Sequence, residues 1–290
     1  MNAVAVPSPE PAVAGFTSRR VEAGGVRWHV LQTGDGPALL LLHGTASSAA
    51  TLTKLATTLG SRFTVIAPDL PGHAGSTVVE GFVPSLPNVA RALSRLLEVV
   101  GIAPVVVAGH SAGAAIGVEM ALRGTVKPRL LVGMASALVP FGRTAAVVYG
   151  SLARTLAQHP SASRWLARRA RATDVVEQVL AGTGSSLERD DVAELRALSG
   201  RAEHVAGVLA MLASWDLDPL FDSLSSLRTP LLLLAGGRDR AVPLGQQRAV
   251  LRRVPRASLV ILGDAGHYLP TERPAEVARE ICRAFGEVSA

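Results

Sequence analysis

The sequence predicts an α/β fold, with a mostly parallel central sheet, helices on both faces and an inserted helical cap. Short, wholly apolar segments recur towards both ends of the chain, and such segments are typical of strands buried in a parallel sheet. Amphipathic helical segments alternate with them, which indicates right-handed strand–helix–strand units. Between these two regions, residues 139–220 show helical periodicity without a convincing strand. A chain of 290 residues is long enough to bury such a core.

The composition is that of a globular protein, because 48% of the residues are hydrophobic and only 18% are charged. The net charge is +6. Basic residues are spread along the chain without interleaved aromatic residues, so nucleic acid is not expected as a partner. We interpret one local arginine cluster as a solvated helix face, while contact with an anion or a peripheral contact with a membrane stays open. Its members are Arg164, Arg168, Arg169 and Arg171.

No internal disulfide is possible, because Cys282 is the only cysteine. Residues 1–18 are expected to be a disordered lead-in, since they contain Pro7, Pro9 and Pro11 and lack the basic and apolar regions of a signal peptide. No apolar run reaches the ~18 residues that a transmembrane helix needs. We therefore predict a cytoplasmic protein without a transmembrane segment. Its expected parts are the lead-in 1–18, a first core part 19–138, the cap 139–220 and a second core part 221–290.

The first core part is expected to contain an edge hairpin and four buried strands. Polar and apolar residues alternate from 19 to 30, and Gly24-Gly25 interrupts them where a hairpin turn belongs. The apolar runs predict strands at 38–42 and 63–67, a strand that begins at 105, and a strand at 130–135. Amphipathic spacing predicts helices at 50–59 and 86–100 between them.

The cap and the second core part follow in order. Helical spacing within the cap predicts helices at 145–156, 162–171, 174–180, 191–198 and 204–215. Such a lid over a pocket can shape substrate choice and exclude water. The strand–helix rhythm then resumes with strands at 230–235 and 258–262 and helices at 244–251 and 274–285.

Ser111 lies at the centre of Gly109-His110-Ser111-Ala112-Gly113, which has the G-x-S-x-G pattern of a nucleophile elbow. A strand that reverses sharply into a helix needs small neighbouring residues. This turn would expose the Ser111 hydroxyl beyond the sheet edge and direct the N–H groups of the helix start towards a developing oxyanion. On its own, however, the pattern also fits a glycine-rich turn without chemistry.

Two further residues, Asp239 and His267, favour a catalytic role for the elbow serine. A serine hydroxyl needs a base within hydrogen-bond reach, and that base needs an orienting carboxylate. Asp239 and His267 each directly follow a predicted strand, as Ser111 does, so all three are expected at one edge of the sheet. We predict Ser111 as the nucleophile, His267 as the general base and Asp239 as the orienting acid. The backbone N–H groups of Ala112 and Thr45 are predicted to hold the oxyanion.

Other residues at this edge have alternative interpretations. Asp264 is the alternative acid, although its place in the same turn as the histidine disfavours it. Asp69 is expected to cap the turn that follows its strand. His43, His73 and His110 each accompany a glycine in a turn and lack the i, i+4 spacing of a zinc pair, so no metal and no cofactor are expected.

With these residues the chain resembles the α/β-hydrolase superfamily, from about Arg19 to Phe285. The matching motifs are His43-Gly44, Asp69-Leu70-Pro71-Gly72-His73, the elbow around Ser111, Gly237-Arg238-Asp239 and Gly266-His267. The resemblance implies the fold and the hydrolytic machinery, but no particular substrate.

The chain is also similar to the magnesium-chelatase accessory proteins of bacteriochlorophyll biosynthesis in photosynthetic bacteria. The matching stretches are Val26-Arg27-Trp28-His29-Val30, His43-Gly44-Thr45, residues 109–115, Val139-Pro140-Phe141-Gly142, Gly182-Thr183-Gly184-Ser185 and Trp215-Asp216-Leu217. Several lie in the cap, where superfamily members usually diverge. This resemblance implies a role near magnesium insertion into protoporphyrin IX, with a tetrapyrrole ligand or chelatase subunits as partners. Ala74 stands where glycine is expected, which puts the shape of its loop in question.

Three functions are compatible with the sequence. The first is a serine hydrolase that acts on an ester or related acyl bond and is accessory to magnesium chelation. The second is a non-catalytic accessory protein that binds a porphyrin or the chelatase. The third is a general carboxylesterase or carbon–carbon bond hydrolase. Dehalogenase and epoxide-hydrolase chemistry are disfavoured, because their elbow nucleophile is a carboxylate and here it is Ser111.

Overall fold

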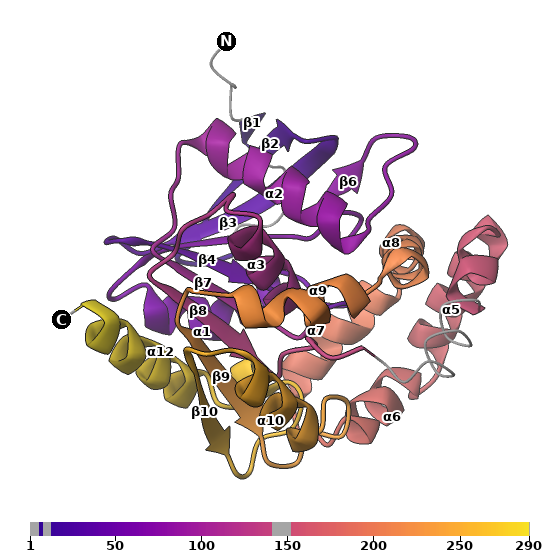
Figure 1. Ribbon diagram of the computed structural model, residues 1–290. Helices are drawn as coiled ribbons and strands as arrows, with labels where there is room; N and C mark the ends of the chain where they lie inside the picture. Colours follow the sequence, from indigo (N-terminus) through magenta and orange to yellow (C-terminus); the bar gives the residue numbers. More distant parts are fainter. Residues whose placement is uncertain (1–5, 8–12, 141–151, 290) are drawn as a thin grey trace.

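The computed structural model describes residues 6–7, 13–140 and 152–289, whose strands form one sheet (Figure 1). The strand order is β1-β2-β3-β5-β4-β7-β8-β9-β10, with β6 beside β3. Along this order, neighbouring strands from β5 to β10 are parallel. The pairs that involve β1, β2, β3 and β6 are antiparallel. The strands are β1 (Val6–Pro7), β2 (Thr17–Ala23), β3 (Val26–Thr33), β4 (Ala38–Leu42), β5 (Thr64–Pro68), β6 (Thr77–Val78), β7 (Val106–His110), β8 (Leu130–Met134), β9 (Leu231–Gly236) and β10 (Ala257–Leu262).

Helices cover both faces of this sheet, which confirms the predicted fold class. Successive strand residues point to opposite faces, so a fully apolar strand can pack on both sides. Leu40 and Leu42 of β4 pack in one cluster with α2, α3 and α10, whereas Leu39 and Leu41 pack in the other with α1 and α12. These helices are α1 (Thr53–Leu59), α2 (Leu86–Val100), α3 (Ala112–Leu122), α10 (Leu244–Arg253) and α12 (Pro274–Ser289).

The N-terminal region differs from the expected disordered lead-in 1–18. β1 pairs with β2 through Val6 opposite Arg20 and Pro7 opposite Arg19, and β2 already begins at Thr17. An edge strand offers unpaired backbone groups to a neighbouring segment, and proline is tolerated in such an edge position. Strand residues thus lie within the expected lead-in, whereas the domain division at 18 stays a prediction. Residues 1–5 and 8–12 lie outside the described residues.

Between β8 and β9 the described residues form helices and no strand. They include α5 (Pro160–Ala172), α6 (Val175–Gly182), α7 (Arg189–Ser199) and α8 (Ala202–Ser214). A small apolar cluster joins α5, α6 and α7 through Ala170, Val176, Leu180 and Leu195. The expected helix at 145–156 lies partly outside the described residues. Its described part is helical, and that helix covers residues 152–157.

The end of the expected cap packs with the core. α9 (Asp218–Ser223) lies against α3, and Leu217 and Leu220 belong to the apolar cluster of α2 and α3. Residues on the cap side of the expected boundary at 220 thus pack with the core, and the boundary itself stays a prediction. In the part of the chain that the structure describes, no helix is both long and apolar enough to cross a membrane.

Helix α8 touches the core through two glycines. A Cβ atom at Gly207 would lie 2.0 Å from the carbonyl oxygen of Gly72, which is in the loop after β5. Arg201 and His204 at the start of α8 add hydrogen bonds to the backbone of Ala74 in the same loop. Ala74, which departs from the family pattern, thus contributes its backbone N–H and carbonyl to the contact between this loop and α8.

The Gly207 contact leads to a prediction. Gly207→Ala should lower the free energy of unfolding by about 1–3 kcal/mol, because the new methyl group collides with backbone atoms. Urea denaturation followed by circular dichroism measures this change. Gly245→Ala is the matched control, since Gly245 is also helical and has open space around it; it should be neutral or slightly stabilising. Equal stability of the two variants would contradict the close contact.

Candidate active site

Ser111 stands at a strained turn between β7 and α3, with φ of +51°. Two glycines make this turn possible. A Cβ atom at Gly109 would lie 2.3 Å from the backbone of Gly113, and one at Gly113 would lie 2.6 Å from the carbonyl oxygens of Leu42 and His43. The expected strand–turn–helix arrangement is therefore present, and it requires these residues to lack side chains.

His267 lies between Ser111 and Asp239. Its Nε2 is 3.2 Å from Ser111 Oγ, and its Nδ1 is 3.0 Å from Asp239 Oδ2. The other oxygen of Asp239 accepts hydrogen bonds from the backbone N–H groups of Ala241 (2.9 Å) and Val242 (2.8 Å). When Nδ1 of the neutral ring donates to Asp239, Nε2 is free to accept the serine proton.

The structure distinguishes the two candidate acids. Asp239 is buried against His267, whereas Asp264 is exposed and its backbone carbonyl accepts a hydrogen bond from the Arg238 guanidinium. The three predicted side chains follow β7, β9 and β10, at the carboxyl edge of the sheet. This arrangement can transfer a proton from a serine hydroxyl to an imidazole.

The two predicted oxyanion donors lie beside Ser111. Ala112 is the first residue of α3 and directly follows Ser111. Thr45 follows Gly44, whose backbone is so close to the elbow that a Cβ atom on it would lie 3.1 Å from Ser111 Cβ. Among the backbone hydrogen bonds of the described turns and loops, neither the Thr45 nor the Ala112 N–H is a donor. The Thr45 side chain instead contacts Met211 Sδ of α8 at 3.9 Å. Their role as donors to a developing negative charge stays a prediction.

His110, next to the elbow serine, joins the elbow to the histidine loop. Its Nε2–H donates to the carbonyl oxygen of His267 at 2.9 Å. Burial, together with the neighbouring His267, lowers the pKa of His110 to about 3, so this ring stays neutral. The position of His110 beside Ser111 was the only sequence signal for this role.

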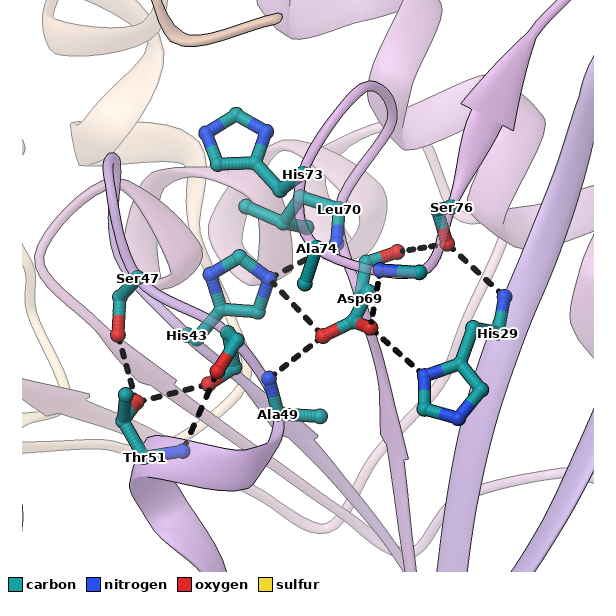
Figure 2. Close-up of polar contacts among 12 residues, drawn as sticks. His29, His43, Ser47, Ala49, Thr51, Asp69, Leu70, His73, Ala74 and Ser76 are labelled. Carbon is teal, nitrogen blue, oxygen red and sulfur yellow. Dashed lines mark hydrogen bonds and ion pairs between the residues drawn. The ribbon is translucent and has the colours of Figure 1, made fainter. Parts of the chain in front are cut away.

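Asp69 lies at the centre of a second buried hydrogen-bond network (Figure 2). Its Oδ2 is 2.7 Å from His29 Nδ1 and accepts from Gly75 N–H at 3.0 Å, while Oδ1 accepts from Ala49 N–H at 2.7 Å. Asp69 therefore caps the following turn, as expected, and also binds β3 and the segment after β4. Burial alone would raise the pKa of this carboxyl, but the hydrogen bonds from the His29 ring and from the Ala49 N–H outweigh it and lower the pKa.

His43 holds the loop that carries Thr45. Its Nε2 accepts from Leu70 N–H at 2.8 Å, and its Nδ1 donates to Gly44 O at 2.8 Å (Figure 2). Burial lowers the pKa of His43, which fits a neutral ring with these two bonds. The ring of His43 lies 5.6 Å from that of His73. Among the described residues, no group of three histidine, cysteine or acidic side chains is placed to hold a metal ion.

We predict that Asp69→Asn destabilises the protein by about 3 kcal/mol at pH 7, because it removes the charged partner of a buried histidine. The folded state lowers the pKa of Asp69, so its contribution is present above the unfolded value of about 3.9 and is lost as pH falls through the lower folded value. The difference from wild type should be steady from about pH 7 to 5 and shrink below about pH 4. Urea titrations across this range measure it. Asp264→Asn, at an exposed site, is the control and should change little.

Known proteins resemble this chain over most of its length. A 30 kDa magnesium-chelatase subunit of Rhodobacter capsulatus is 38% identical over 271 residues, which cover 93% of this chain and 94% of the relative. This similarity confirms the narrower resemblance expected from the cap motifs. A pimeloyl-[acyl-carrier protein] methyl ester esterase of Nitrosomonas europaea is 27% identical over 249 residues, covering 82% and 92% of the two chains.

Solved structures and family membership agree on the fold. The structure of a thermophilic esterase from Thermogutta terrifontis superposes with a TM-score of 0.75 at 23% identity and covers 100% of both chains. The alpha/beta hydrolase family matches residues 39–280. Because this match extends over most of the sheet and includes all three residues at its carboxyl edge, the chain belongs to the alpha/beta hydrolase family.

Proposed function

We propose that the protein is a serine hydrolase that cleaves an ester or a related acyl bond at Ser111. The observation that carries the proposal is the continuous contact from Asp239 through His267 to Ser111, with distances of 3.0 and 3.2 Å. Hydrolase names among the relatives support the reaction class.

In the proposed reaction, His267 Nε2 takes the hydroxyl proton while Ser111 Oγ attacks the acyl carbon. The carbonyl oxygen becomes negative, and the N–H groups of Thr45 and Ala112 stabilise it; each such donor is typically worth about 3 kcal/mol. The imidazolium, held by Asp239, then gives its proton to the leaving oxygen. Water repeats the sequence and releases the acid from the acyl-enzyme.

We propose a substrate connected with tetrapyrroles, in a role accessory to magnesium chelation for bacteriochlorophyll. The Rhodobacter relative carries a chelatase name. The cap supplies a second supporting observation: Arg164, Arg168 and Arg171 line a groove of about 200 Å³ together with Gly200 and Glu203. Guanidinium groups bind carboxylates through paired hydrogen bonds, so this groove fits the propionates of a porphyrin.

The same groove supports a second candidate, a non-catalytic protein that binds a porphyrin or chelatase subunits. A general carboxylesterase or carbon–carbon bond hydrolase is the third candidate, because the geometry at Ser111 does not select a substrate. Exposed Trp165 lies on the arginine-rich helix α5, and a peripheral membrane contact of this face stays a prediction. The cytoplasmic location also stays a prediction.

Covalent labelling tests the hydrolase proposal. A fluorophosphonate probe followed by intact mass spectrometry should add one adduct to the wild type and none to folded Ser111→Ala, because the probe needs an activated serine. Asp239→Asn should slow labelling by about 10⁴-fold, whereas Asp264→Asn should leave the rate unchanged. Unlabelled but folded wild type would favour the binding candidate instead. Slow labelling of Asp264→Asn would instead favour Asp264 as the acid.

The groove predicts a contribution of arginine to porphyrin binding. The double variant Arg164→Ala/Arg168→Ala should raise the Kd for protoporphyrin by about tenfold or more, since charged hydrogen bonds are lost. Fluorescence titration measures this Kd. Arg95→Ala is the matched control, because Arg95 is an exposed arginine of α2 paired with Glu98. Unchanged affinity in the double variant would show that the groove does not bind the porphyrin.

A further inference from the structure

Residues 183–186 of the cap lie against both loops that carry the proposed acid and base. They follow α6, and Gly184 adopts a left-handed conformation with φ of +79°. This segment contacts the residues on either side of Asp239 and the residues on either side of His267.

The first set of contacts is with the acid loop. Arg240 N–H donates to Thr183 O at 3.0 Å. A Cβ atom at Gly184 would lie 2.0 Å from the carbonyl oxygen of Arg238, so the two backbones are in direct contact. Arg238 and Arg240 flank Asp239, and the segment therefore fixes the backbone on both sides of the carboxylate.

The second set of contacts is with the histidine loop. Tyr268 N–H donates to Ser185 Oγ at 3.0 Å, and a Cβ atom at Gly266 would lie 2.4 Å from Gly184 O. The Ser185 hydroxyl also lies 3.0 Å from that of Thr183. Gly266 and Tyr268 flank His267, so the segment holds the backbone on both sides of the imidazole, as it does on both sides of the carboxylate.

The carboxylate of Glu272 in α11 (Leu269–Glu272) strengthens this junction. Both of its oxygens lie 3.1 Å from Gly266 N, and Oε2 also accepts from Ser186 N–H at 3.4 Å. One carboxylate thus links the histidine loop to the cap segment. The two loops also bond each other directly, through Arg238 N–H to Ala265 O at 2.9 Å, but that bond does not involve the cap.

We infer that residues 183–186 are a positioning element that keeps the Asp239 and His267 loops in register. The reactivity of Ser111 then depends on the docking of this cap segment. The inference rests on the proposed function and deepens it, because it gives the cap a part in the chemistry besides covering a pocket. Proton transfer is sensitive to such alignment, since a displacement of about 1 Å can cost about 100-fold in rate.

Ser185→Ala tests the inference, because it removes the acceptor of Tyr268 N–H. The rate constant of fluorophosphonate labelling should fall by about tenfold or more, while thermal unfolding shows that the variant is folded at the assay temperature. Ser185→Thr keeps a hydroxyl and should restore most of the rate. Thr173→Ala is the matched cap control: its hydroxyl donates to Arg169 O at a helix end, and its loss should leave the rate unchanged.

A second measurement separates positioning from reactivity. In proton NMR of protein labelled with ¹⁵N-histidine, the Nδ1 proton that His267 shares with Asp239 should give a downfield signal in wild type and in Ser185→Thr. This signal should be broadened or lost in Ser185→Ala, because a displaced ring exposes the proton to exchange.

The outcomes are distinct. Equal labelling rates in wild type and Ser185→Ala, together with an unchanged His267 Nδ1 proton signal in the variant, would overturn the positioning role. If the wild type itself is not labelled, the hydrolase proposal fails, and the NMR comparison alone decides: a signal lost in Ser185→Ala supports positioning, and an unchanged signal refutes it.

Discussion

The close approach of three backbones around Ser111 is the constraint on which the site depends. β7, α3 and the end of β4 meet at distances that leave no room for side chains at Gly109 and Gly113. This contact forces Ser111 into its strained conformation and brings the start of α3 to the carboxyl edge of the sheet. Because the neighbouring parallel strands end at the same edge, their loops can reach the serine.

Polar side chains then hold the loops around Ser111, and Asp69, His43 and His110 among them are buried. Asp69 and His43 fix the loop that carries Thr45, His110 joins the elbow to the histidine loop, and Glu272 joins that loop to the cap. Burying such groups is unfavourable unless they are hydrogen-bonded. Their bonds across elements therefore make the arrangement specific, since a shifted loop would leave a buried polar atom unpaired.

Local patterns in the sequence predicted the strands and the elbow, because an apolar run such as 38–42 and a G-x-S-x-G turn depend on neighbouring residues alone. The contact of Asp239 with His267 followed from strand order. Contacts to backbone groups were not predictable: the pairing of Asp69 with His29 spans 40 residues, and the N–H groups that bind Ser185 and Glu272 carry no residue signature. The short edge strand β1 was missed because its prolines suggested disorder.

We propose that Ser111 is an activated nucleophile beside an oxyanion site formed by the N–H groups of Thr45 and Ala112. A crystal structure of the protein after reaction with a small alkyl phosphonate tests it most directly. We expect a covalent bond from Ser111 Oγ to phosphorus, with the phosphoryl oxygen about 3 Å from the N–H groups of Thr45 and Ala112. Phosphorus bound elsewhere, or a phosphoryl oxygen turned away from both donors, would contradict the account.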